Sequence, residues 1–346
     1  MLTVSRRAQA VIASPIRKLF PLIRAAEARG VHVYKLNVGD PEIEMPAKLI
    51  STIRRYPYRR LPYAPSPGLP EHVGAWVRYY ATFGVTVTPE QIIPTLGCAE
   101  AILLTLLAVT DPGDEVIVFE PLYTSYRGFA VMASIRLVPL TLRLEDSFAL
   151  PTMAALEAKV TRRTKAIVVA HPSNPTGRVR SVAERERIVR IARRHNLFLI
   201  ADETYREIVF RGRPSTFLRY PKARQHVIVV DSASKRFSCP GARIGCVVSA
   251  NQDVGWSVLK YAMVRLSAPT LEQHALIPLL RHPTAYTRRV TAEYRRRRDV
   301  VVSALRAIPG VVCPKPSGAF YVIARVPVED AEDFVRFLIA DFRLGG

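Results

Sequence analysis

The sequence has few cysteines and no long hydrophobic run. Its 4 cysteines form no CxxC pair and have no histidine set at zinc spacing near them, so we expect neither a disulfide framework nor a metal site. Apolar stretches such as residues 101–109 fall well short of the ~18 residues that a membrane helix needs, which excludes an integral membrane protein. The basic N-terminus, residues 1–13, lacks the apolar centre of a secretory signal, and we therefore expect a cytoplasmic protein.

Acidic residues are also scarce. The 29 Asp and Glu residues face 50 Lys and Arg residues, and the net charge is +21. A basic excess can indicate a nucleic-acid partner, but the basic clusters, at residues 54–55, 59–60 and 295–298, are scattered, and we find no helix-turn-helix or winged-helix region. We interpret the clusters as solvated helix faces with weak attraction for polyanions, and we expect no specific nucleic-acid partner.

Short apolar runs alternate with helix-length segments over most of the chain. Because the runs are almost wholly apolar, they are expected to be strands buried on both faces of a mostly parallel sheet, which predicts an α/β fold. Ligands bind such sheets at the carboxyl ends of the strands. Expected helices include residues 99–109 and 182–195, and the expected strands are residues 115–119, 135–139, 166–170, 197–201, 227–230 and 244–249.

The pattern changes after residue 275. A long basic helix over residues 284–308 leads to a strand-like run that ends at Val326, and a last helix covers residues 329–340 before turn-like residues 344–346. This order of expected helices and strands predicts a smaller α+β domain. We therefore expect three parts, which are an N-terminal arm (1–45) contributing to the small domain, a large domain (46–275) and a small domain (276–346).

A lysine flanked by serines follows the expected strand 227–230. Ser232 and Ser234 precede Lys235, and Arg243 comes eight residues later between two glycines. Two hydroxyls and a guanidinium near one lysine would make a phosphate cradle beside an amine. Schiff-base chemistry on a phosphorylated aldehyde needs that arrangement. A surface lysine after a strand is the alternative interpretation.

Asp202 ends the apolar strand 197–201. A carboxylate there is costly unless a cation pairs with it, and a protonated pyridine nitrogen would be such a cation. Tyr205, three residues later, could hydrogen-bond a phenolate oxygen. The alternative role for Asp202 is a helix N-cap.

Three further segments are ambiguous when each is taken alone. Asn174 lies in a proline-rich turn after strand 166–170 and could point its amide at a ligand oxygen. Gly97, Cys98 and Ala99 open a helix whose first amides could bind a phosphate. Tyr123 follows strand 115–119 and could stack on a cofactor ring, or it could simply be a core residue.

Together, in this order at successive strand ends, these motifs resemble the fold type I pyridoxal-phosphate (PLP) aminotransferases of class I/II, and most of all bacterial aspartate aminotransferases. The resemblance begins near Ser14 and is most specific at Ser232-Ala233-Ser234-Lys235, Gly241-Ala242-Arg243-Ile244-Gly245 and Asn174-Pro175-Thr176-Gly177. It implies a PLP-transferase fold, in which helices sandwich a mostly parallel seven-stranded sheet beside a smaller α+β domain. It also implies a homodimer.

The resemblance implies a role for each matching residue. Lys235 would bind PLP covalently and move a proton to and from the substrate Cα, while Asp202 would keep the pyridine nitrogen protonated. The other implied cofactor contacts are Tyr205 and Asn174 at the 3′ oxygen, Ser232, Ser234, Arg243, Gly97, Cys98 and Ala99 at the phosphate, Tyr123 on the ring, and Tyr63 at the phosphate of the neighbouring subunit. Gly39 and Asn174 would lie beside the substrate.

The implied reaction moves an amino group from an L-amino acid, aspartate or similar, to a 2-oxo acid such as 2-oxoglutarate. One departure stands out, because family members continue for several tens of residues after the helix 329–340, with an arginine that binds the substrate α-carboxylate. No residue here matches it, and Arg343 is not assigned that role. We therefore expect an incomplete small domain. Two alternatives stay open, a poorly active PLP-binding remnant and a PLP-dependent C–S lyase.

Overall fold

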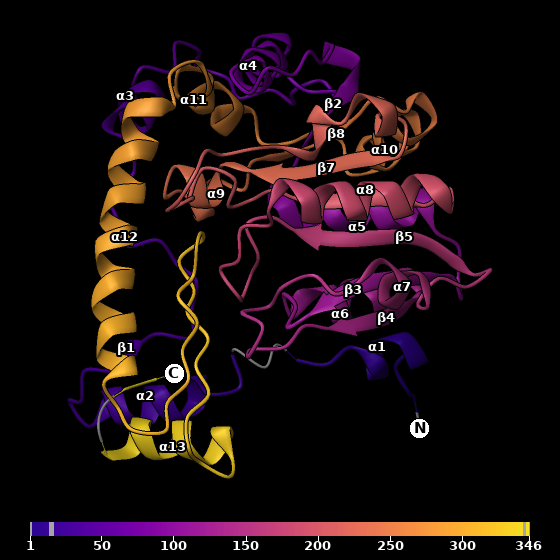
Figure 1. Cartoon of the computed structure of the whole chain (residues 1–346). Coiled ribbons are helices and arrows are strands. Elements are labelled where there is room, and N and C mark those ends of the chain that lie inside the picture. Colours follow the sequence, from indigo (N-terminus) through magenta and orange to yellow (C-terminus); the bar gives the residue numbers. More distant parts are fainter. Residues whose placement is uncertain (1, 14–16, 342–343, 346) are drawn as a thin grey trace.

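The structure is a computed structural model that describes residues 2–13, 17–341 and 344–345 (Figure 1). Ser14, where the resemblance was expected to begin, and Arg343 both lie outside the described residues. In the described part, a layered body that contains the large sheet lies beside the long helix α12 (Thr284–Arg306). No helix among the described residues is both long and apolar enough to cross a bilayer.

The central sheet has seven strands in the order β2-β8-β7-β6-β5-β3-β4. Strand β8 runs antiparallel to both of its neighbours and the other pairs are parallel, which confirms the predicted α/β fold with a mostly parallel sheet. The strands are β2 (Ile92–Thr95), β3 (Glu115–Glu120), β4 (Arg136–Thr141), β5 (Thr164–Ala170), β6 (Phe198–Asp202), β7 (Val227–Ser232) and β8 (Gly245–Ser249).

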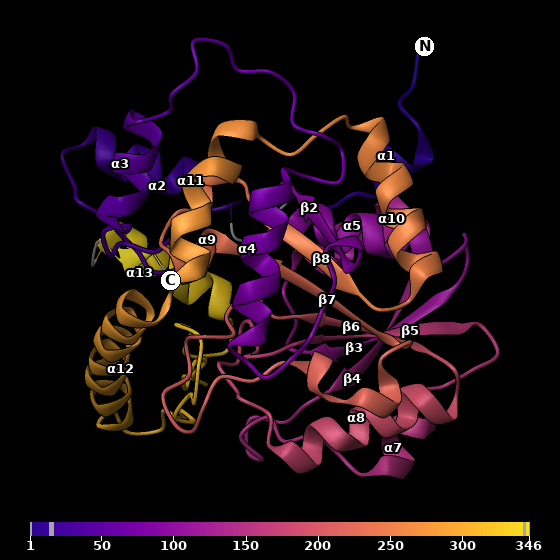
Figure 2. The same ribbon diagram turned by 90° about the horizontal axis from the view of Figure 1, so that it is seen from above.

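Helices cover both faces of this sheet (Figure 2). Strand β7 shows why, because Val227 and Val229 pack into one apolar cluster while Ile228 and Val230 pack into the other, as the two-residue period of a strand requires. One face is covered by α5 (Gly97–Val109), α6 (Ser125–Ala133) and α10 (Gln252–Val264), and the other by α4 (Pro70–Ala81), α7 (Met153–Glu157) and α8 (Val182–Arg194).

The N-terminal segment packs against the C-terminal helix. Leu19 and Ile23 at α2 (Phe20–Ala28) share a cluster with Ile339 of α13 (Ala331–Asp341). Strand β1 (Tyr34–Lys35) pairs in parallel with β9 (Leu344–Gly345), so residues 344–345 form a short strand and the expectation of a turn there was wrong. The remaining helices are α1 (Arg6–Ala10), α3 (Ala47–Arg54), α9 (Ala233–Arg236) and α11 (Thr270–Arg281), with 3₁₀ turns at Pro89–Gln91, Phe217–Arg219, Pro221–Ala223 and Pro240–Ala242.

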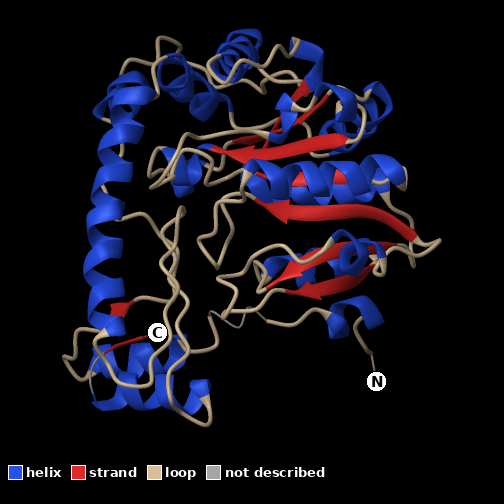
Figure 3. Ribbon diagram, in the orientation of Figure 1, coloured by secondary structure: helices blue, strands red, loops and turns tan. Residues whose placement is uncertain are grey.

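The strand-like run that was expected to end at Val326 is not a regular strand, and Figure 3 draws this part of the chain as loop. Among the described residues its β-type pairing is limited to isolated bridges, between Gly318 and Val209 and between Arg325 and Val312. An apolar run becomes a strand only where a partner offers a continuous hydrogen-bonding edge, and here the prolines at 316 and 327, which lie on either side of the run, cannot donate to such an edge.

Candidate active site

A cavity of about 660 Å³ lies at the carboxyl ends of the central strands. β6 ends in Asp202 and β7 ends in Ser232, and both residues line this cavity. Eleven of the residues that the sequence singled out share its wall, namely Gly39, Cys98, Ala99, Tyr123, Asn174, Asp202, Tyr205, Ser232, Ser234, Lys235 and Arg243. The structure therefore brings together side chains that lie up to about two hundred positions apart in the chain.

Two predicted site residues do not line this cavity. The Cα of Gly97 packs against the Arg243 guanidinium, and a Cβ there would lie 2.7 Å from Nη2, so this glycine makes room for the arginine. Tyr63 is 80% exposed and borders a separate hollow with Tyr58 and His274.

Lys235 lies on α9, the helix that follows β7 without a break. Its Nζ donates a hydrogen bond to the carbonyl oxygen of Gly39 at 2.5 Å. Burial lowers the pKa of the Lys235 amine; Asp40 opposes this shift and Arg243 adds to it. A lysine amine with a lowered pKa is more readily deprotonated, and a nucleophile or general base must be neutral.

Asp202 is buried and its carboxylate is held from two sides. Oδ1 accepts from the Thr204 amide at 3.1 Å and from the Cys98 thiol at 3.5 Å, and Oδ2 accepts from the Tyr126 hydroxyl at 2.9 Å. Burial and the charge of Asp202 keep the pKa of Tyr126 well above its usual value, so this phenol remains a donor. Within the described part of the chain, Asp202 forms no ion pair, so the cavity contains a buried carboxyl group to which a cationic ligand could bind.

Tyr205 is also buried, and its hydroxyl hydrogen-bonds the hydroxyl of Tyr321. Burial, followed by the neighbouring Tyr321, raises the pKa of Tyr205 well above its usual range. Both phenols therefore stay protonated near neutral pH. Asn174 lies on the same cavity wall, in the loop after β5.

Hydrogen-bond donors that could bind an anion lie together on one part of the cavity wall. The hydroxyls of Ser232 and Ser234 hydrogen-bond each other at 2.7 Å, and Arg243 is fixed by bonds to the carbonyls of Leu96 at 3.0 Å and Pro240 at 2.9 Å. Helix α5 begins at Gly97 with no side-chain cap, so its first amides remain available as donors. This set of hydroxyls, guanidinium and helix amides fits a phosphate group.

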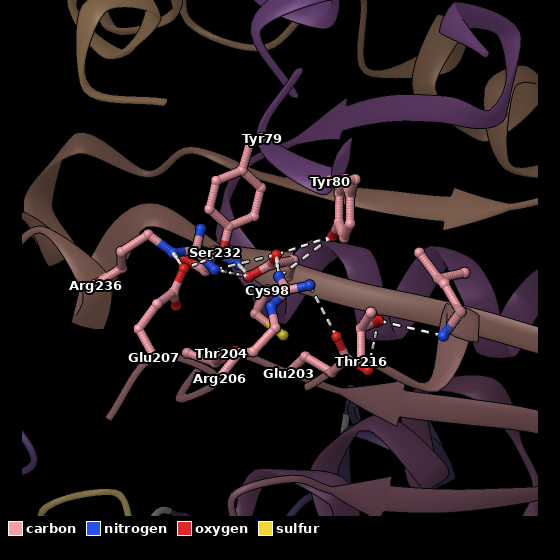
Figure 4. Close-up of polar contacts among 12 residues, drawn as sticks. Tyr79, Tyr80, Cys98, Glu203, Thr204, Arg206, Glu207, Thr216, Ser232 and Arg236 are labelled. Carbon is pink, nitrogen blue, oxygen red and sulfur yellow. Dashed lines mark hydrogen bonds and ion pairs between the residues drawn. The ribbon is translucent and has the colours of Figure 1, made fainter. Parts of the chain in front are cut away.

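A buried charge network supports the short helix α9, which carries Lys235 (Figure 4). Asp231, directly before Ser232, accepts from the Ser232 amide at 2.7 Å and from Arg236 Nη2 at 2.9 Å. Arg206 pairs with Asp231 and with Glu203, and Arg236 also pairs with Glu207 at 2.6 Å. Both arginines are fully buried, and removing one partner from such a network typically costs about 3–5 kcal/mol. The network thus fixes the backbone on both sides of Lys235.

Further residues at the site were not predicted. Tyr126 on α6 does not line the cavity but donates to Asp202, and it lies three positions after Tyr123, a helical spacing that could have suggested it. Arg17 and Tyr321 line the cavity, but they come from the segment before α2 and from the loop before α13. Nothing local in the sequence indicates that these two segments meet the strand ends.

Comparison with known proteins agrees with this architecture. Residues 31–344 match the family model for aminotransferase class I and II. The aspartate/prephenate aminotransferase of Thermus thermophilus is 32% identical over 327 residues, or 92% of this chain and 83% of that protein. The LL-diaminopimelate aminotransferase of Desulforudis audaxviator is 32% identical over 328 residues, or 92% and 82%. The solved structure of Thermus thermophilus aspartate aminotransferase with maleate matches with a TM-score of 0.92 at 30% identity, covering 98% of this chain and 90% of that one.

Proposed function

The chain belongs to the class I and II aminotransferases, which use pyridoxal phosphate, and from this premise we propose that it moves an amino group from L-aspartate, or a similar acidic amino acid, to a 2-oxo acid such as 2-oxoglutarate. The observation that carries the proposal is a pair of groups in one cavity. Asp202 offers a buried carboxylate without a cationic partner among the described residues, and Lys235 offers an amine whose pKa burial has lowered.

The residues of the cavity fit pyridoxal phosphate. Asp202 would hold the protonated pyridine nitrogen, since that nitrogen supplies the missing cation. Other contacts would come from Tyr205 and Asn174 at the 3′ oxygen, from Tyr123 on the ring, and from Ser232, Ser234, Arg243 and the amides of residues 97–99 at the phosphate. When bound, the cofactor supplies an electron sink that makes the substrate Cα proton removable.

Lys235 would perform two tasks with one nitrogen. It would hold the cofactor covalently in the absence of substrate, and it would then take the proton from the substrate Cα as general base. Burial favours the neutral amine that both tasks need. Gly39, whose carbonyl accepts from Lys235, would lie beside the substrate.

The position of Arg17 favours the proposal that the substrate is an acidic amino acid. Arg17 lines the same cavity as Lys235, and no side chain in the described part of the chain forms an ion pair with it. Guanidinium and carboxylate match in geometry and charge, so Arg17 would bind one carboxylate of a dicarboxylic substrate. The name of the Thermus thermophilus relative, an aspartate/prephenate aminotransferase, agrees with this choice.

We further propose a cytoplasmic homodimer, with the chain divided into an arm (1–45), a large domain (46–275) and a small domain (276–346). Leu61, Tyr63 and Leu266 expose large apolar surfaces, and Ser66 bonds the carbonyl of Leu266 at 2.6 Å, so these segments adjoin. Tyr63 does not line the cavity of its own chain, and a second copy would let it reach the partner's phosphate site. Sedimentation of wild type and Tyr63→Ala tests this, since a monomeric wild type would contradict it.

The reaction itself is tested by its dependence on an acceptor. The purified chain with PLP and L-aspartate should form oxaloacetate beyond one equivalent of cofactor only when 2-oxoglutarate is added, and glutamate should then appear in equal amount to that further oxaloacetate. Ammonia released without any 2-oxo acid would instead indicate a lyase. Arg17→Gln should raise the KM for L-aspartate about tenfold or more, whereas the exposed Arg24→Gln on α2 should not.

A further inference from the structure

The loop before α13 places a second phenol behind Tyr205. We propose that Tyr321 is a positioning residue, whose hydroxyl donates to the Tyr205 oxygen and so turns the Tyr205 proton toward the cofactor's 3′ oxygen. This inference rests on the proposed function. It goes beyond it by giving a role to a residue outside the sequence motifs of the site.

Backbone contacts hold the Tyr321 segment between two loops of the site. Gly318 donates to the carbonyl of Gly177 at 2.8 Å, in the loop that carries Asn174. Ala319 donates to the carbonyl of Ile208 at 2.8 Å, in the turn that follows Tyr205. A Cβ at position 318 would lie 2.7 Å from the Ile208 carbonyl oxygen, so the segment packs tightly. The position of Tyr321 is thus set by the same loops that position Asn174 and Tyr205.

The hydrogen bond between the hydroxyls of Tyr205 and Tyr321 can run in either direction. Tyr205 and Tyr321 hydrogen-bond each other, and in the described part of the chain no other side chain bonds either hydroxyl. Each phenol has a single proton, so only one of them can be the donor of this bond. Burial keeps both protonated, since it raises the pKa of Tyr321 to about 12 and that of Tyr205 well above its usual value. If Tyr205 donates into the cavity, Tyr321 must be the donor to Tyr205.

When Tyr321 donates to Tyr205, the hydrogen bond from Tyr205 to the cofactor's 3′ oxygen becomes stronger. A hydroxyl that accepts a hydrogen bond becomes a better donor, because the bonds in a chain polarise one another. A better Tyr205 donor stabilises the ionised 3′ oxygen and makes it less basic. The lysine-bound nitrogen of the cofactor, which shares a proton with that oxygen, then loses its proton at lower pH.

Tyr321→Phe isolates this effect. The ring of Tyr321 packs 5.1 Å from the ring of Phe320, and a phenylalanine keeps that packing while it removes the hydroxyl. Tyr294→Phe is the matched control, because Tyr294 belongs to the same apolar cluster and packs on Phe320 at 4.8 Å. Its hydroxyl is buried and makes no bond to Tyr205.

The test is a pH titration of the visible absorption band of the PLP-loaded chain. Tyr321→Phe should raise the midpoint by about half a pH unit, Tyr205→Phe should raise it further, and the double variant should match Tyr205→Phe alone. Tyr294→Phe should leave the midpoint unchanged. An unshifted Tyr321→Phe, additive shifts in the double variant, or an equal shift in Tyr294→Phe would each overturn the inference.

This readout separates the inference from the function on which it rests. A wild-type chain that shows a titrating visible band but no shift in Tyr321→Phe overturns only the role of Tyr321. A wild-type chain that shows no such band with PLP overturns the proposed function, and the inference with it.

Discussion

The side-chain nitrogen of Lys235 lies 2.5 Å from the carbonyl oxygen of Gly39. This contact joins the helix after β7 to the N-terminal arm, so the arm forms part of the wall around the reactive amine. A side chain at position 39 would collide with the hydroxyl of Tyr321. The segment therefore approaches the site closely because residue 39 is a glycine.

Gly39→Ala is expected to displace this part of the wall. The added methyl group must push away Tyr321 or the arm, and a displacement of about 1 Å near the reacting groups can cost on the order of 100-fold in rate. We expect kcat/KM for L-aspartate to fall about 10- to 100-fold. Gly128→Ala on α6 is the control, since a Cβ there meets nothing within 4 Å. Equal activity in the two variants would contradict this reading of the arm.

Asp202→Asn should lower both PLP affinity and turnover. The variant keeps the shape of the side chain and an oxygen that can accept from Thr204 and Cys98, but it replaces the oxygen that accepts from Tyr126 and removes the charge that would pair with the pyridine nitrogen. Losing one partner of a buried charge pair costs about 2–5 kcal/mol, which is roughly 30-fold to several thousand-fold in kcat/KM. Tyr126→Phe, which removes one donor to the carboxylate, should cost about tenfold. The exposed Asp253→Asn should behave as wild type, and an active Asp202→Asn would refute the assignment.

Arg243→Gln should weaken binding of the phosphate alone. A charged hydrogen bond contributes about 1.5–3 kcal/mol, so the Kd for PLP should rise about 10- to 150-fold. The Kd for pyridoxal, which lacks the phosphate, should change less than about twofold. Equilibrium dialysis with both compounds measures the difference. If the two Kd values rose together, Arg243 would be holding the fold of the site rather than a phosphate.

Stability should fall as the pH drops below about 6.5. Burial lowers the pKa of His72 to about 3, and its ring is held neutral between the Gln273 carbonyl and the Trp76 indole. Between pH 3 and 6.5 the unfolded chain binds a proton at this histidine and the folded chain does not. Each such group lowers the free energy of unfolding by up to about 1.4 kcal/mol per pH unit as the pH falls.

Urea unfolding at pH 4 to 6 checks this contribution. His72→Gln should unfold more easily at pH 7, but its stability should depend less steeply on pH than that of wild type. The exposed His282→Gln should keep the wild-type slope. A slope unchanged in His72→Gln would show that this histidine is not the group that binds the proton.

The sequence predicted the sheet and the strand-end residues because both follow from local patterns. Runs such as residues 227–230 are apolar throughout, and a residue that follows a parallel strand necessarily lies at the ligand-binding edge. Strand β2 was missed because its four residues include Pro94, which local propensity assigns to a turn or an edge. Residues 344–345 were misassigned because only their distant partner, Tyr34–Lys35, makes them a strand.

The rest of the site depends on contacts between distant segments. Arg17 and Tyr321 reach the cavity from opposite ends of the sequence, through packing of the arm and through backbone bonds at Gly177 and Ile208. No spacing or composition of those segments encodes such an approach. The same limit explains the buried pair of Asp231 and Arg236, which bracket Lys235 and which sequence alone presents as ordinary charges.

The most direct test of the central claim is the visible absorption spectrum of the 346-residue chain with PLP, before and after L-aspartate. We predict a visible band that L-aspartate removes and 2-oxoglutarate restores, and that borohydride abolishes while it fixes the cofactor to the protein. Lys235→Ala should lose the borohydride-fixed cofactor, and Lys260→Ala, exposed on α10, should keep it. Cofactor that borohydride still fixes to Lys235→Ala, or a wild-type band that no amino acid alters, would contradict the account.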